Sequence, residues 1–453
     1  MRLNTRPRLG AFAASAVSVM VLATPVLPAA AQAPRPVTMV EALTLAAQKN
    51  HGLRVAAVEV KIARAQLAQA EAAKSGQLVL SASYTRVNER EGGTMVIPPG
   101  TIPGIIVPIV ITLPAPDPNV YSAALTYQVP LHSGGRIESQ IALAQANLRG
   151  AEAALERVKH QVVLDVKQAY FQVLLAQAGV EVAARAAAAA DENLRVARAR
   201  VAAGVSPRFD EVQAEVSLAN ARQGGIRSRN SLALAQQGLS AMMALPLDTV
   251  LQPRETMTVT PIRGDAAGLV RRALEGRPEL TEHFARVDMA LAAIEIARAG
   301  GRPFVALSGG PSYGNPGGSS VTTTGWAVTI AATVPLFDGG VTAQRVREAE
   351  ARVEQLREVE AQIRQGIELE VRRALLNFSS AAEELAAADK AVELAQEGLR
   401  IANVRFAAGV STNLEVVTAQ ASLSQAEGNR IQALFNVNLA RAQIERAVGG
   451  AVE

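Results

Sequence analysis

The chain has 453 residues, of which 49% are hydrophobic but only 3% are aromatic, so small aliphatic residues must supply most of the packing, as in helical bundles. The formal charge is +4, with 45 Lys and Arg against 41 Asp and Glu and no basic run, which argues against nucleic acid as a partner. Cysteine is absent, which excludes disulfides, thiolate metal sites and thiol catalysis.

The N-terminal segment, residues 1–31, has the pattern of a secretory signal peptide. Arginines precede an apolar stretch from Leu9 to Leu27, and small residues offer a cleavage site after Ala31. A retained helical anchor is the alternative interpretation. The sequence shows no later run of 18 apolar residues, so we expect an exported chain without a membrane-spanning helix.

The rest of the chain is duplicated, with a first repeat over 32–250 and a second over 251–453. The heptapeptide that starts at Val129 recurs at Val334, and the one that starts at Arg200 recurs at Arg405. Both pairs are offset by 205 residues, so the helix between the two motifs has the same length in each copy.

Each repeat is predicted to contain an entry helix, two strands, a long helix and a return helix. The long helices, 136–203 and 341–408, carry apolar residues at spacings of three, four and seven, which is typical of coiled coils. At 1.5 Å per residue each is roughly 100 Å long. The entry helix (37–74) and the return helix (208–245) are about half that length, so two stacked end to end match one long helix.

Four segments alternate apolar and polar residues at period two: about 77–88, 119–130, 303–313 and 325–335. Their length suits transmembrane β-strands, and they hold four of the five tyrosines and the single tryptophan. A half-buried sheet of a soluble protein is the alternative, but the signal peptide favours the membrane. A spanning barrel needs about eight strands, so several chains must assemble one barrel.

The loop 89–119 is long, rich in proline and apolar, whereas a loop in water is usually polar. Three interpretations stay open for it: it plugs the mouth of a channel, it contacts lipid, or it is a disordered proline-rich loop.

The long helices end at similar breaks. Gly204 precedes Ser206 and Pro207, which predicts a C-terminal cap at Gly204, an N-cap at Ser206 and a new helix at Pro207. In the second repeat, Thr412 to Glu415 fits a capping box.

No catalytic, cofactor or metal motif stands out in the sequence. Gly134-Gly135 is not followed by the residues of a phosphate-binding loop. The four histidines are scattered: His51, His132, His160 and His283. We therefore predict no enzyme activity, no cofactor and no metal site.

Taken together, these features resemble the TolC family of outer-membrane efflux factors over nearly the whole mature chain. The resemblance depends on the duplicated halves, the strand-to-helix junctions at Pro130 and Pro335, and the Ala-Gly-Val-Ser tips at Gly204 and Gly409. It implies a mainly α-helical fold with a small β part: coiled-coil hairpins in two tandem repeats plus four transmembrane strands. Three copies then form one duct, a twelve-stranded barrel in the outer membrane with a twelve-helix tunnel across the periplasm.

The resemblance also implies a function. Such ducts are homotrimers in outer-membrane lipid that passively conduct drugs, toxic molecules or secreted proteins from an inner-membrane pump, joined by a periplasmic adaptor. We expect the tips to dock the adaptor through Gly204, Val205, Ser206, Gly409, Val410 and Ser411. The cargo and the pump family do not follow from these motifs.

The family closes its periplasmic end at an acidic constriction just beyond the second tip. Glu415 lies six residues after Gly409, and Asp210 lies at the matching position of the first repeat. The family's second acidic position falls near Thr418, and Phe406 stands where a gate tyrosine can sit, so the double acidic ring and the tyrosine hydrogen bond are missing here. Glu415 either lines the pore or only caps its helix.

Two other classes of protein share some of these features. A periplasmic adaptor has one coiled-coil hairpin rather than two, and lacks four aromatic-bearing strands. A structural coiled-coil surface protein would lack the paired strand–Pro-Leu junctions.

Overall fold

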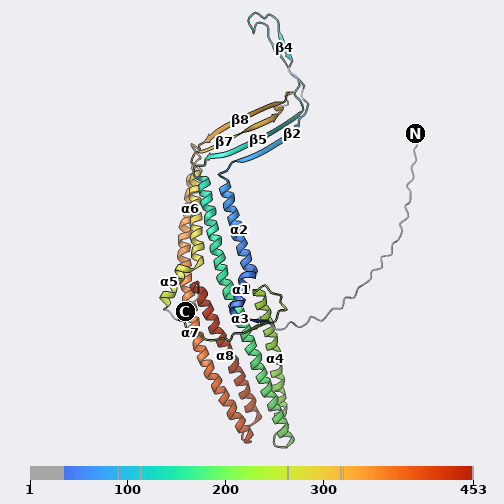
Figure 1. Cartoon of the computed structure of the whole chain (residues 1–453), viewed down its shortest axis with the longest axis vertical. Coiled ribbons are helices and arrows are strands. Elements are labelled where there is room, and N and C mark those ends of the chain that lie inside the picture. Colours follow the sequence, from blue (N-terminus) through green and yellow to red (C-terminus); the bar gives the residue numbers. More distant parts are fainter. Residues whose placement is uncertain are drawn as a thin grey trace, which may run out of the picture.

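The computed structural model describes residues 35–89, 91–112, 115–262, 265–316, 319 and 321–450. The predicted signal peptide lies outside these residues. The molecule is a long rod with a sheet near one end and two helical hairpins that reach the other end (Figure 1). The fold is mainly helical with a small amount of sheet, as expected.

Four helices belong to the first repeat: α1 (Met39–Lys49), α2 (His51–Ala72), α3 (Arg136–Ala202) and α4 (Arg208–Met242). The entry helix is two helices rather than one, because the Asn50 side chain accepts hydrogen bonds from the backbone N–H groups of Gly52 and Leu53 and caps α2. The Asn50 amide also donates to the Met242 carbonyl at 2.9 Å. This bond joins the start of α2 to the end of α4, so the two helices are stacked along α3 (Figure 1).

The second repeat supplies α5 (Ala266–Gly276), α6 (Pro278–Ala299), α7 (Val341–Ala407) and α8 (Asn413–Val448). The helices α3 and α7 are each 67 residues long, which corresponds to about 100 Å. The described part of the chain therefore pairs each long helix with shorter helices above and below its middle (Figure 1).

The main sheet has four antiparallel strands in the order β2-β5-β7-β8. The strands are β2 (Gln77–Arg86), β5 (Asn119–His132), β7 (Phe304–Gly314) and β8 (Thr323–Thr333). Within the described residues no further strand pairs with β2 or β8, so both are edges. The large apolar side chains on these edges are exposed, among them Leu80 and Trp326.

Two smaller pairings complete the sheet structure. Strands β1 (Arg35–Val37) and β6 (Leu251–Pro253) pair in parallel and link the start of the first repeat to the end of α4. Strands β3 (Thr94–Ile97) and β4 (Ile109–Thr112) form an antiparallel hairpin within the proline-rich segment between β2 and β5. Part of that segment therefore has regular structure.

Each repeat has an apolar core near the middle of its long helix. In the first core, Tyr170 of α3 is buried and donates its hydroxyl to the Val37 carbonyl at 3.2 Å, and burial raises the pKa of Tyr170 to about 12. In the second, Val371 of α7 packs with Leu269 of α5 and Ile444 of α8. Each core holds the shorter helices of its repeat against the middle of the long helix.

One stretch of α3 is apolar enough by length and composition to cross a membrane, with a mean hydropathy of 1.4 over 18 residues. The expectation that no such stretch follows the signal peptide is corrected by this finding. The helix itself contacts α2, α4, α6 and α8 and is far longer than the roughly 20 residues that a span requires.

Candidate functional site

The first tip, Gly204–Ser206, is a tight helix end. Gly204 has a φ of 75°, which a residue without a side chain adopts at little cost. The Val205 N–H donates to the Arg200 carbonyl at 3.0 Å, and the Gly204 N–H donates to the Val201 carbonyl at 3.0 Å. These two bonds form a Schellman motif and satisfy carbonyls that the end of α3 would otherwise leave free.

The second tip, Gly409–Ser411, repeats this geometry. Gly409 also has a φ of 75°, and the Val410 N–H donates to the Arg405 carbonyl at 3.1 Å. Val205 and Val410 are both exposed. Each hairpin therefore presents a small valine-bearing apex at the same distance from the sheet.

Both helices that follow the tips begin differently from the prediction. Helix α4 starts at Arg208 with Pro207 as its N-cap, and the Ser206 hydroxyl donates to the Asp210 carboxylate at 2.5 Å instead of capping the helix. Thr412 is the N-cap of α8, but in the described part of the chain its hydroxyl caps none of the first-turn amides. The capping box predicted from Thr412 and Glu415 is therefore not formed.

The acidic residues near the tips have different surroundings. Asp210 is 8% exposed, whereas the Glu415 side chain is 48% exposed and lies 3.3 Å from Arg405 Nε. Thr418, one turn further along α8, is also exposed. Glu415 is thus the acidic side chain that is open to its surroundings, with an arginine as its counter-charge.

The hairpin α3–α4 contacts the hairpin α7–α8 just above the tips. Arg200 Nη1 donates to the Phe406 carbonyl at 2.8 Å, and its guanidinium lies 4.6 Å from the centre of the Phe406 ring. Asn413 Nδ2 donates to the Asp210 carbonyl at 3.2 Å. Phe406 is buried with Ala402 and Val416, so it packs between the hairpins rather than facing open space.

This junction is unusually rich in unsatisfied polar atoms. Among the described residues, most of the buried side-chain atoms without a hydrogen-bond partner lie near the tips, on α3, α4 and α8: Asn193 Nδ2, Arg200 Nε, Gln213 Oε1, Asn413 Oδ1 and Gln420 Oε1. The contact between the hairpins is therefore more polar here than in the apolar cores.

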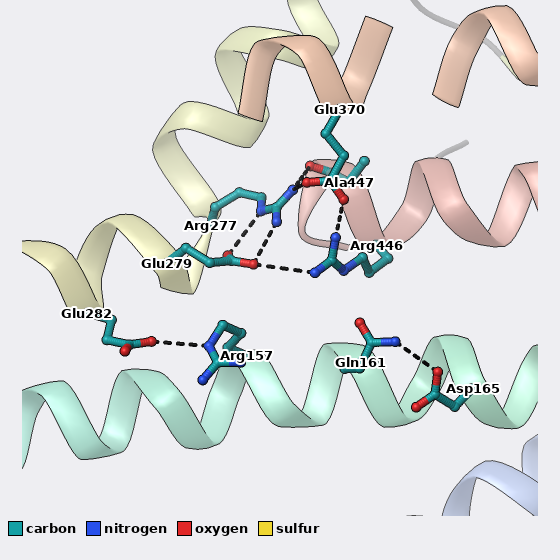
Figure 2. A network of polar contacts seen from close by, with 9 residues as sticks. All are labelled: Arg157, Gln161, Asp165, Arg277, Glu279, Glu282, Glu370, Arg446 and Ala447. Atoms are coloured by element: carbon teal, nitrogen blue, oxygen red, sulfur yellow. Dashed lines mark hydrogen bonds and ion pairs between the residues drawn. The ribbon is translucent and has the colours of Figure 1, made fainter. Parts of the chain in front are cut away.

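A charged network holds the middle of the second repeat together, as Figure 2 shows. Arg277, at the break between α5 and α6, is 4% exposed and donates to Glu279, to Glu370 of α7 and to the Ala447 carbonyl of α8. Arg446 of α8 completes it through ion pairs with Glu370 and Glu279. This network is not evident from the sequence, because its members are distant in the chain and only Arg277 beside Pro278 marks a helix break.

A second contact in Figure 2 joins the repeats to each other. Arg157 of α3 donates to Glu282 of α6 at 3.1 Å. Among the described residues no group of three or more His, Asp or Glu side chains is arranged to hold a metal ion. Arg157 and Glu282 thus have a structural role that links α3 to α6.

The sequence matches the family model described as outer membrane efflux protein over residues 42–245 and 269–450. The chain belongs to this family, which confirms the resemblance seen in the sequence. The family is one of transport channels rather than of enzymes.

Individual relatives agree with this assignment. The cobalt-zinc-cadmium resistance protein CzcC of Cupriavidus metallidurans is 24% identical over 92% of this chain and 91% of its own. The outer membrane protein TolC of Vibrio cholerae is 24% identical over 74% of this chain and 77% of its own.

Solved structures show the same fold. The outer membrane protein VceC from Vibrio cholerae superposes with a TM-score of 0.72 at 20% identity, covering 92% of this chain and 97% of its own. The CusC structure gives a TM-score of 0.73 at 20% identity, with 91% and 92% covered.

The protein is therefore an outer-membrane channel of the kind that serves tripartite efflux and secretion systems, and it extends into the periplasm. The alternatives of an adaptor or a surface coiled coil are set aside by the family match.

The Arg277 network generates a prediction for stability. We expect Arg277→Met to lower the free energy of unfolding by roughly 2–3 kcal/mol, because it leaves Glu279 without its main counter-charge. The loss is smaller than for a fully buried pair, since Glu370 is 35% exposed and keeps Arg446. The matched control is Arg400→Met, which removes an exposed pair with Glu397 on the same helix and should leave the free energy of unfolding nearly unchanged.

The same network has a pH signature. Burial raises the pKa of Glu279, but the hydrogen bonds and charge of Arg277 outweigh it, so the net pKa lies below its usual 4.5. A lowered carboxyl pKa gives stability that is present above 4.5 and is lost as the pH falls through the folded value. Denaturant unfolding from pH 7 to pH 3 should show a smaller acid loss in Arg277→Met than in wild type. Equal acid losses would contradict the role of the network.

Proposed function

We propose that three copies of this chain close around one axis and form a continuous duct from the periplasmic tips to the cell exterior. The observation that carries this proposal is that two sides of the chain hold unpaired strand edges and exposed apolar helix faces. One side consists of β2, α2 and α4, and the other consists of β8 and α7.

The sheet supports closure most directly. Backbone groups on the free edges of β2 and β8 have no water to bond in hydrocarbon, so each edge needs another strand. Pairing β8 of one copy with β2 of the next satisfies both edges in one cyclic arrangement. Two copies would give eight strands, whose interior is filled by side chains, whereas three copies leave room for a water-filled channel.

The helices repeat the same arrangement. In the described chain, α3 packs against α2, α4, α6 and α8, while α7 packs against α5, α6 and α8. The outer side of α7 exposes large apolar residues: Leu369, Leu376, Leu394, Ile401 and Val404. The stacked helices α2 and α4 expose others: Val55, Val58, Ile62, Val212, Val216, Ile226 and Leu234. Helices α2 and α4, with 22 and 35 residues, together extend along most of the length of the 67-residue α7, so the two sides are complementary.

A charge on the exposed side of α7 tests this arrangement. Leu376→Asp should reduce the trimer fraction by at least tenfold, because a carboxylate would be buried against the next copy. Leu376→Met keeps the apolar surface and should assemble like wild type. Native gels of detergent-extracted protein measure the trimer. Wild-type assembly of Leu376→Asp would contradict the proposed packing.

We propose that the tips dock the hairpin tips of a periplasmic adaptor. The support is the matched geometry of Gly204 and Gly409 and the exposure of Val205 and Val410. A bulky residue at Gly409 is a less specific test of docking, because the backbone φ of 75° at this position strains any residue that has a side chain.

Val410→Asp leaves the backbone unaffected and is the sharper test. We expect it to abolish co-purification of the adaptor while the trimer remains in the outer membrane, because an exposed valine would contribute apolar contact area. Val410→Thr has a similar shape without charge and should bind nearly normally. Wild-type adaptor binding by Val410→Asp would exclude docking at the second tip.

We propose further that Glu415 lines the periplasmic constriction, with Thr418, Asp210 and Phe406 supporting it. Three Glu415 carboxylates close to one axis would create a local negative potential, but Arg405 in each copy offsets it. Opening would separate the hairpins at the junction, which would break the hydrogen bonds of Arg200 to Phe406 and of Asn413 to Asp210.

Neutralising either member of the Glu415–Arg405 pair tests whether the pair lines the pore. Glu415→Gln leaves Arg405 unbalanced and should shift channel selectivity toward anions, whereas Arg405→Gln should shift it toward cations. Both shifts should shrink at 1 M salt, where the Debye length is about 3 Å. Reversal potentials in a salt gradient measure them, with Glu397→Gln, further up α7, as the control. Unchanged selectivity in both variants would place Glu415 outside the pore.

We assign no catalysis to this chain, since conduction requires only an open path. Relatives carry names that refer to metal resistance, protease secretion and pyoverdine export. We therefore attribute the choice of cargo to the inner-membrane pump and its adaptor rather than to the duct.

A further inference from the structure

The β3–β4 hairpin is the one large feature of the described chain that neither the sheet nor the helices explain. It continues β2 and β5 on the side away from the helices and stands clear of the main sheet (Figure 1). Its connecting turn is closed by its own backbone, with the Gly100 N–H donating to the Ile105 carbonyl at 2.9 Å.

The hairpin is apolar on both faces. The sequence has no charged residue from 92 to 116, a span of two strands and their turn. Successive residues of a strand point to opposite faces, and the neighbours Met95 and Val96 are both exposed, as are Val110 and Ile111. Ile106, in the turn, is 89% exposed. A two-stranded hairpin with two apolar faces is not stable as a free element in water, so it needs a partner on both faces.

The edges of the ribbon decide between kinds of partner. Two paired strands leave the outer edge of each strand without hydrogen bonds, and those backbone groups would be unsatisfied in hydrocarbon. Lipid would cover the faces but not the edges. Apolar hairpins of the same kind can do both: their strands pair with the free edges, and their side chains pack against the faces. The neighbouring copies of this chain supply such hairpins.

We propose that the three β3–β4 hairpins of the trimer associate with one another across the outer mouth and form an apolar closure above the barrel. This inference rests on the proposed trimer. The hairpin follows directly from β2, which is the strand at the edge between copies, so closure of the barrel brings the hairpins together at high effective concentration. Without charges they approach one another with no electrostatic repulsion.

A single cysteine tests the proposal, because the natural chain has none. We expect Ile106→Cys to form disulfide-linked dimers between copies under mild oxidation, since the turns meet near the axis. Val321→Cys is the matched control: it is an exposed valine just before β8, in the connection between β7 and β8, and it should stay monomeric on a denaturing gel. Native gels of the same samples report whether the trimer is present.

A second measurement distinguishes packing between hairpins from insertion of the hairpin into lipid. A nitroxide spin label on Ile106→Cys should be shielded from both dissolved oxygen and a water-soluble nickel complex if the hairpins pack together. Intact trimers without a cross-link, or a label that is accessible to oxygen but not to nickel, would overturn the proposal, and the latter result would place the hairpin in lipid. Absence of the trimer itself would contradict the proposed duct instead.

Discussion

The structure depends on one constraint: a four-stranded sheet with two free edges cannot remain in hydrocarbon. The sheet order β2-β5-β7-β8 leaves the first and last strands unpaired within the described chain. Water is absent from a bilayer core, so in the proposed duct these edges pair with other copies. The same two sides of the chain continue downward as α2 with α4 and as α7, so in the proposed trimer one interface would serve both the barrel and the tunnel.

The helical part must keep the geometry that this closure requires. Helices α3 and α7 have the same length, 67 residues, and each is paired with two shorter helices that meet near its middle. At that level the Tyr170 core and the Arg277 network fix the helices, whereas near the tips the hairpins are joined by the hydrogen bonds of Arg200 and Asn413 and by the packing of Phe406. In the proposed duct, the end that opens is therefore the end with the smaller apolar cluster between its helices.

Much of the fold was predictable from local sequence patterns. The repeat offset, the long helices and the period-two strands are visible because each is set by residues near one another in the chain. The break at Asn50, the Ser206 bond to Asp210 and the Arg277 network were not predicted, because each depends on a partner brought close by folding. The β3–β4 hairpin was missed because its prolines and glycines suggested a loop.

The number of chains in one duct tests the central claim most directly. Native mass spectrometry of the protein extracted from outer membranes in mild detergent counts the copies in the intact complex. The account predicts three chains, released as monomers when the detergent is replaced by denaturant. A complex of one or two chains that still conducts ions in a planar bilayer would contradict it.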